Sequence, residues 1–219
     1  MITFEDVKRN REIHAYIKKA DEAIGALGYT DHAFAHVTKT AKATGQLLRD
    51  LGYDERTAEL GEIAGYLHDI GNVINRSDHA HSGALMAFKM LNMMEMDPEE
   101  VATIICAIGN HDENTGFPVN EVAAAVILAD KSDVRRCRVR TKEKCAFDIH
   151  DRVNYAVVNG SLTLQKEERA LVLDLEIDTE ICPVMDYFEI FLERMLLCRR
   201  SANYFNLNFG LVINGLKLL

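Results

Sequence analysis

The stretch Tyr66-Leu67-His68-Asp69-Ile70-Gly71-Asn72 places a histidine beside an aspartate at the end of an apolar run. Neighbouring residues on a helix point about 100° apart, so this pair cannot face each other but can lean toward one ion between them. Imidazole and carboxylate together suit a divalent cation, and a carboxylate can bridge two. The alternative is a capped helix end in which Gly71 takes the left-handed conformation. The rest of the chain has to decide between these interpretations.

The composition is that of an ordinary globular chain. It has 219 residues, of which 48% are hydrophobic and 27% charged, and this length suits one domain or one domain with an appendage. No apolar run reaches the ~18 residues that indicate a membrane span. Residues 1–6 lack the basic region that begins a secretory signal. We therefore expect a cytoplasmic protein without a membrane partner.

Charge and cysteine usage exclude further classes. A net charge of −9 argues against general nucleic-acid binding, which depends on neutralising phosphates. The cysteines are scattered without CxxC spacing, which indicates reduced cytosolic thiols and no zinc knuckle. They are Cys106, Cys137, Cys145, Cys182 and Cys198. Because the chain is acidic, an anionic substrate requires a local group of basic residues.

Helical patterns follow one another through the first 140 residues. Apolar residues recur at helical spacing, and capping residues before a pattern or glycine after it mark the ends. Asp97-Pro98-Glu99-Glu100 is a strong start signal: a capping aspartate, a proline in the first turn, and two acids at the positive end of the dipole. The predicted helices are 6–27, 31–51, 54–69, 81–96, 98–110 and 120–136. Short connections between them predict a helical bundle.

From about residue 147 the pattern changes. Residues 153–158 and 161–165 flank Asn159-Gly160 and predict a β-hairpin. Residues 170–177 alternate with period two and predict a third strand, residues 183–203 an amphipathic helix, and residues 209–216 a further strand. We therefore predict a mainly α protein: a helical domain over 1–145 and a small α+β subdomain over 146–219, with three or four strands and one helix.

Several histidines and aspartates lie within or near the ends of the predicted helices. They are His36, His68, Asp69, His79, His81, His111 and Asp130. Asp130 is the most informative, because it follows Val126-Ile127-Leu128-Ala129, the most apolar stretch of the chain. An ionised carboxylate there is costly unless a cation pairs with it. The cation is either a metal ion or a basic neighbour such as Lys131.

The ordered set His36, His68-Asp69 and Asp130 resembles the H…HD…D signature of the HD superfamily of metal-dependent phosphohydrolases. The matching neighbourhoods are residues 31–37, 67–71 and 127–131. The resemblance implies an HD-type helical bundle in which these four residues bind a divalent metal. It also implies that the metal activates a water for attack on a phosphate ester.

Four further motifs resemble a degenerate form of the HD-GYP subgroup, which hydrolyses cyclic di-GMP. The subgroup's HDIGK, HPxxG, HHE and GYP are similar to residues 68–72, 81–84, 110–112 and 116–118, with departures at Asn72, Asn110 and Phe117. This resemblance implies a second metal held by His81, His111 and a bridging Asp69. His32 stands where the subgroup has an acidic ligand, and we assign it to the substrate side. Whether His79 or His32 replaces one of these ligands stays open.

Basic residues follow Asp130 closely. Lys131 is adjacent, and Arg135 and Arg136 begin the densest basic cluster of the chain. Lysine and arginine bind phosphate oxygens, so we assign these three to substrate binding, with Lys131 and Asp69 also catalytic. The alternative is a solvated basic helix end, which the helix dipole favours without any ligand.

The expected function is a metal-dependent phosphohydrolase, including phosphodiesterase activity, acting on a nucleotide or cyclic (di)nucleotide. The expected cofactor is one or two divalent ions per chain, among Mn, Fe, Ni, Co, Zn and Mg. Two alternatives remain: a di-iron oxygenase built on the HD fold, and a non-catalytic nucleotide-sensing module. A homodimer is a further expectation, since a small sheet alone is only marginally stable.

Overall fold

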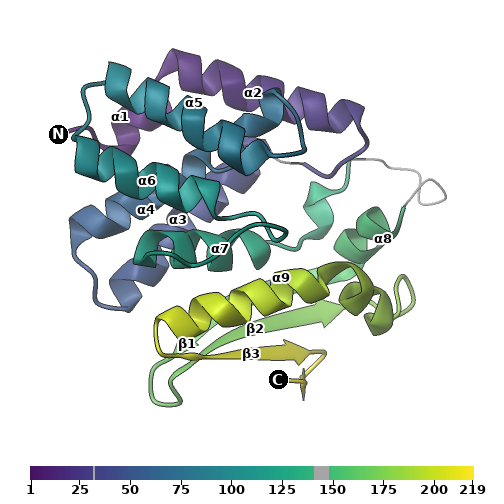
Figure 1. The fold of residues 1–219 in the computed structure, drawn as a ribbon. Coiled ribbons are helices and arrows are strands. Elements are labelled where there is room, and N and C mark those ends of the chain that lie inside the picture. Colours follow the sequence, from purple (N-terminus) through teal and green to yellow (C-terminus); the bar gives the residue numbers. More distant parts are fainter. Residues whose placement is uncertain (32, 141–147) are drawn as a thin grey trace.

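Helices form the N-terminal part of the protein, and a sheet backed by one long helix forms the C-terminal part (Figure 1). The structure is a computed structural model that describes residues 1–31, 33–140 and 148–219. The helices are α1 (Phe4–Arg9), α2 (Arg11–Ala26), α3 (Phe34–Asp50), α4 (Glu55–Leu67), η1 (Ile70–Val73), α5 (His79–Met93), α6 (Pro98–Gly109), α7 (Glu121–Lys131), η2 (Arg136–Arg138), α8 (Ile149–Ala156) and α9 (Val184–Tyr204). The predicted mainly α architecture is confirmed.

Capping side chains explain where several helices begin. Asp54 and Asp97 each accept hydrogen bonds from backbone N–H groups of the first turn, as the sequence predicted. The single helix predicted over 6–27 is wrong, because Asn10 interrupts it and its side chain caps α2. The helix predicted to start at residue 81 starts at His79, and α7 ends at Lys131 instead of continuing to residue 136. Both shifts bear on the site described below.

The predicted hairpin around Asn159-Gly160 is wrong. Residues up to Ala156 belong to α8, and Asn159 and Gly160 lie inside one continuous strand, β1 (Val157–Gln165). The two residues follow a register irregularity between Val157 and Asn159, which accommodates the turn-prone pair without reversing the chain. The chain reverses after Gln165 instead, where Arg169 takes a positive φ of 49°.

The C-terminal sheet has the order β1-β2-β3-β4, with β2 (Ala170–Ile177), β3 (Asn208–Ile213) and β4 (Leu216–Lys217). β2 and β3 are parallel, and α9 makes the crossover between them. The predicted strand 170–177 is confirmed, and the predicted strand 209–216 is divided between β3 and β4. The sheet therefore presents α9 to the rest of the molecule.

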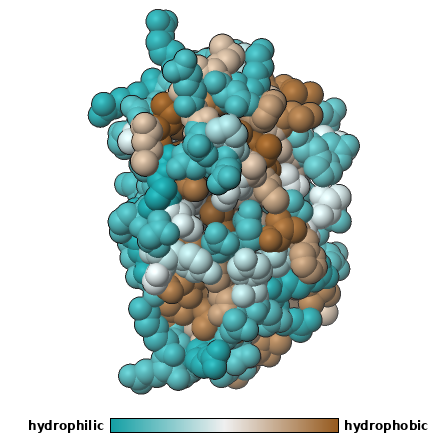
Figure 2. Space-filling view, turned by 60° about the vertical axis from the view of Figure 1, so that its left-hand side comes forward, coloured by the Kyte–Doolittle hydropathy of each residue, from teal (hydrophilic) through white to brown (hydrophobic). Residues whose placement is uncertain are grey.

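One hydrophobic cluster joins the two parts. α9 packs against α7 on one side and against β2 and β3 on the other, as Figure 1 also shows. Buried side chains run without a break from Val7 in α1 through α7 to Ile213 in β3. Hydrophilic residues cover most of the face shown in Figure 2, with hydrophobic residues between them in small groups. Among the described residues, no helix is long and apolar enough to cross a membrane.

Gly71 serves close packing rather than a left-handed cap. It lies within η1, and its φ is not positive. A Cβ atom there would overlap the carbonyl oxygen of His79 and lie 2.5 Å from the backbone nitrogen of Gly83. The absence of a side chain at Gly71 thus lets the start of α5 rest directly on the turn that carries His68 and Asp69.

We expect Gly71→Ala to lower the free energy of unfolding by about 1–3 kcal/mol, because the added methyl forces backbone apart. Gly109→Ala is the matched control, since its Cβ would meet only the Ala84 Cβ at 3.7 Å. Denaturant unfolding of both variants measures the difference. Equal stability of the two variants would contradict the packing role of Gly71.

Candidate metal centre

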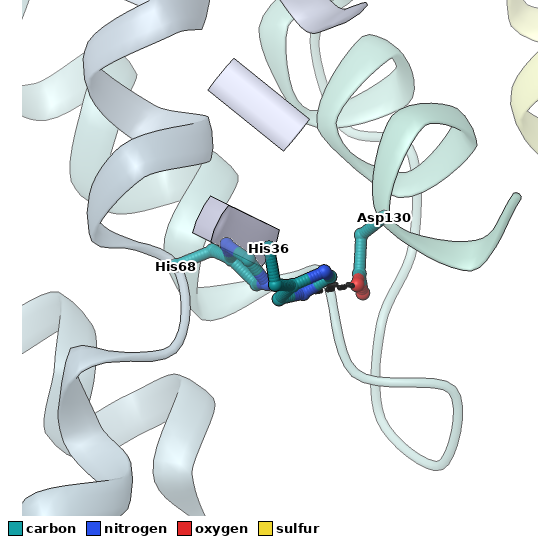
Figure 3. A group of neighbouring side chains, drawn as sticks. All are labelled: His36, His68 and Asp130. Atoms are coloured by element: carbon teal, nitrogen blue, oxygen red, sulfur yellow. Dashed lines mark ion pairs between the residues drawn. The ribbon is translucent and has the colours of Figure 1, made fainter. Parts of the chain in front are cut away.

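Four side chains from three helical segments meet in the bundle core. His36 extends from the first turn of α3, His68 and Asp69 follow α4, and Asp130 lies in the last turn of α7. His36 Nε2 lies 3.3 Å from Asp130 Oδ1 and 3.6 Å from Asp69 Oδ2. His68 Nε2 lies 3.2 Å from Asp69 Oδ2 and 3.5 Å from Asp130 Oδ1. Figure 3 shows both rings directed toward the Asp130 carboxylate.

These separations fit one divalent ion. Nitrogen and oxygen ligands about 2.1 Å from an ion in tetrahedral arrangement lie roughly 3.4 Å from one another, close to the distances found here. All four side chains are buried. His68 Nε2 makes no hydrogen bond within the described part of the chain, although solvent cannot reach it. A buried nitrogen facing two carboxylate oxygens is the donor set that a transition-metal ion requires.

A hydrogen bond at Nδ1, on the side of the ring away from the cluster, fixes the orientation of each histidine. His68, His79 and His111 direct Nδ1 at the backbone carbonyl oxygen three residues earlier, at 2.8, 3.1 and 2.6 Å. Because a carbonyl can only accept, Nδ1 is the donor in each ring and Nε2 is the nitrogen directed toward the cluster. His36 Nδ1 is held in the same way by Asp133 Oδ2 at 2.8 Å. All four rings thus present Nε2 as a ligand.

Asp69 faces two groups of ligands. Its Oδ2 atom faces His36 and His68, whereas Oδ1 lies 3.5 Å from His79 Nε2. His79 Nε2 lies in turn 3.1 Å from His111 Nε2. His68, Asp69 and His111 also form a group whose ligand atoms all lie within 4.8 Å of one another. The two oxygens of the carboxylate therefore face two different groups of potential ligands.

One predicted ligand does not reach the cluster. His81 is turned away from the cluster: its side chain is 59% exposed and its Nδ1 lies 3.7 Å from Asp78 Oδ1. His79 takes the predicted place instead, because α5 begins two residues earlier than expected and two residues turn a helix by about 200°. His32, the other residue left open by the sequence, lies outside the described residues.

Local charge suits cation binding. Burial opposes protonation of His68, but the carboxylates of Asp69 and Asp130 outweigh it and raise its pKa to about 10. Burial also opposes ionisation of Asp130, yet Lys131 and His68 hold the pKa of Asp130 well below its usual range. Burial lowers the pKa of both His79 and His111. Asp130 is thus ionised and attracts positive charge, and His79 and His111 stay neutral, as ligands must be, whereas His68 gives up a proton when a metal binds.

The predicted phosphate-binding residues divide into two kinds. Lys131 is buried, with Nζ 2.8 Å from Asp130 Oδ2 and 2.7 Å from Glu113 Oε2. Arg135 instead pairs with Asp133 at 2.6 Å, and Arg136 donates to the Tyr155 carbonyl. Neither arginine is among the residues that line the cavity beside the ligands, so their assignment to substrate binding stays a prediction. Their guanidinium groups serve local structure.

A cavity of about 710 Å³ opens onto Asp69, His79, His111 and Asp130. Its basic wall residues include Arg76, Lys131, Arg138 and Arg194. Sequence reasoning missed Arg76 and Arg194 here, as it missed Glu113 and Asp133. Asp133 had a signal, since it follows Asp130 by three residues, and the turn that ends α7 holds its N–H against the Asp130 carbonyl at 3.0 Å. Arg194 had none, because it enters from a distant helix.

Comparison with known proteins identifies the motif-bearing region. The family model described as "HD domain" matches residues 33–156. The uncharacterized protein MJ1020 of Methanocaldococcus jannaschii is 24% identical over 202 residues, covering 81% of this chain and 76% of that protein. No solved structure matches. The family match includes His36, His68, Asp69 and Asp130, and ends where α8 ends.

We expect Asp133→Asn to weaken metal binding by about 10–100-fold, the usual effect of removing a group that orients a ligand. The amide loses the charge that holds His36 Nδ1–H and pairs with Lys39 at 2.8 Å. Metal titration followed by calorimetry measures the change. Asp174→Asn, an exposed carboxylate on β2, is the control and keeps wild-type affinity. Equal affinity in both variants would refute the orienting role.

Proposed function

The chain belongs to the HD domain family, and we propose that it hydrolyses a phosphate ester at the metal centre formed by His36, His68, Asp69 and Asp130. An HD domain indicates metal-dependent hydrolase activity in general. The observation that carries the finer proposal is the convergence of two imidazole nitrogens and two carboxylate oxygens at 3.2–3.6 Å beside a cavity with a basic wall. The ligands supply the metal chemistry and the basic wall favours an anionic substrate.

These residues would hold a divalent ion, which would supply a water nucleophile at neutral pH and neutralise charge on the phosphate. The chain's own residues perform the remaining tasks. Asp69 directs its two oxygens to the two ligand groups and so fixes their relative position. Lys131, held between Asp130 and Glu113, places an ammonium group at the cavity wall, where it can contact a phosphate oxygen.

A nucleotide is the proposed substrate class. The cavity is large enough for more than a phosphate group, since ligand pockets of ~300–1,000 Å³ accept drug-sized molecules. Tyr29 lines the same cavity and its ring lies 5.7 Å from the Arg76 guanidinium, which offers an aromatic surface beside a cation. Asn72, Asn110 and Phe117 depart from the HD-GYP motifs, so we do not propose cyclic di-GMP specifically.

The second ligand group supports a binuclear centre. A binuclear centre is also what the alternative function, a di-iron oxygenase, would need. His79, His111 and the Oδ1 atom of Asp69 offer three ligand atoms for another ion. Two ions suit hydrolysis of phosphate esters, and two iron ions also suit oxygen activation. Phosphate release without oxygen, tested on a panel of nucleotides and phosphate esters with Mn, Fe, Co, Ni, Zn or Mg, separates the two chemistries. Oxygen-dependent product formation would contradict our proposal.

We expect Asp69→Ala to lose bound metal and hydrolysis together, because its carboxylate faces both ligand groups and compensates their charge. Elemental analysis and an assay of phosphate release measure the two losses, and circular dichroism checks the fold. A variant that keeps wild-type metal content and turnover would contradict the assignment of Asp69.

We expect His79→Ala to reduce the metal content by one ion per chain and to slow hydrolysis by at least about tenfold. His81→Ala, on the same helix, should match the wild type in both respects because its ring is exposed beside Asp78. Metal content per chain in the two variants distinguishes these outcomes. If only His81→Ala lost metal, the assignment made here would be reversed.

A further inference from the structure

We propose that Arg194 of α9 binds the phosphoryl group of the substrate, so that the C-terminal part of the chain completes the active site. The inference rests on the proposed hydrolysis of a phosphate ester. Arg194 lies outside residues 33–156, which the HD domain matches. The site residue assigned here is therefore one that the family match does not include.

A series of alternating charges links Arg194 to the metal centre. Arg194 Nε donates to Glu113 Oε1 at 3.2 Å, and Glu113 Oε2 forms an ion pair with Lys131 Nζ at 2.7 Å. Lys131 Nζ also contacts Asp130 Oδ2 at 2.8 Å. All four side chains line the same cavity. Glu113 thus holds an ammonium and a guanidinium group side by side, next to a metal-ligating carboxylate.

The guanidinium group keeps hydrogen-bond donors for a ligand. Arginine has five N–H groups in a planar fork, and here only Nε–H is engaged by a hydrogen bond within the described residues. The guanidinium lies over the Phe191 ring at 4.5 Å, and the side chain is 21% exposed at the cavity wall. Stacking on an aromatic ring restrains the plane of the fork, and such a fork binds two phosphate oxygens at once.

The packing of α9 against the core does not by itself explain why an arginine occupies position 194. Phe191, Met195, Cys198 and Ala202 are buried and already hold the helix against the core. A partly buried ion pair contributes little net stability compared with apolar packing, because both charges lose water. Glu113 moreover has Lys131 as a second cationic partner. Lys131 alone would pair with Glu113, so Arg194 is a second cation that this pairing does not require.

The charge balance favours an anion once a metal is bound. Lys131 and Arg194 carry two positive charges, and Glu113 and Asp130 carry two negative charges. A divalent ion that takes Asp130 as a ligand shares its negative charge, which leaves the two basic groups less compensated. A phosphoryl group beside the ion restores the balance and accepts the remaining guanidinium hydrogen bonds.

The test uses three variants of the full chain. Arg194→Gln keeps a donor for Glu113 but removes the charge and the fork, Arg194→Lys restores charge alone, and Arg199→Gln removes an exposed arginine from the same helix. Metal content and thermal unfolding are measured first. Binding of inorganic phosphate to the metal-loaded protein is then measured by calorimetry, and KM and kcat are measured with the best substrate of the panel.

We expect Arg194→Gln to keep its metal and to bind phosphate about 10–100-fold more weakly, with KM raised in proportion, as for the loss of a charge-assisted hydrogen bond. Arg194→Lys should recover part of the affinity, and Arg199→Gln all of it. Unchanged phosphate affinity and KM in Arg194→Gln would overturn the inference and leave the proposed function standing. Arg194-dependent phosphate binding without any ester hydrolysis would support the inference and count against the proposed function. If Arg194→Gln does not fold, wild-type phosphate affinity in Arg194→Lys would overturn the inference, because a lysine lacks the fork.

Discussion

The metal centre depends on hydrogen bonds made on the far side of each histidine ring. His68, His79 and His111 each donate Nδ1–H to the carbonyl of the residue three positions earlier, and His36 donates to Asp133. These bonds orient each ring and direct every Nε2 inward before any ion arrives. The ligands are thus positioned by the buried ends of α3, α4 and α7. Binding then needs little reorganisation of the protein.

The buried carboxylates impose the second constraint. Asp69 and Asp130 are almost inaccessible to solvent, and ionised groups in such surroundings are costly unless positive charge compensates them. Lys131 and the raised pKa of His68 show that positive charge is drawn to this point from several directions. α7 is buried from Val122 to Lys131, and this otherwise apolar buried stretch ends in two charged residues, Asp130 and Lys131. The centre is in this sense a cation site built into the core.

Sequence reasoning located the residues that lie on strongly patterned helices. His36, His68, Asp69 and Asp130 were predicted as one group because their order and spacing are specific, and the structure brings them together. His81 was assigned through its resemblance to the HPxxG motif, whereas the structure places His79 beside Asp69 and exposes His81. The hairpin predicted at Asn159-Gly160 is wrong because strand pairing outweighs the local turn propensity of these two residues. Arg194 has no local signal, since only the tertiary fold brings α9 to α7.

The C-terminal part is required to place that arginine with precision. α9 is fixed at both ends by parallel strands β2 and β3, and on both sides by buried contacts with the sheet and with α7. A flexible tail carrying the same arginine would lose conformational entropy on each encounter with a ligand. A helix held in a shared hydrophobic core has already lost that freedom during folding. The division expected at residue 145 therefore separates two segments of sequence, whereas the hydrophobic core and the cavity wall are continuous across it.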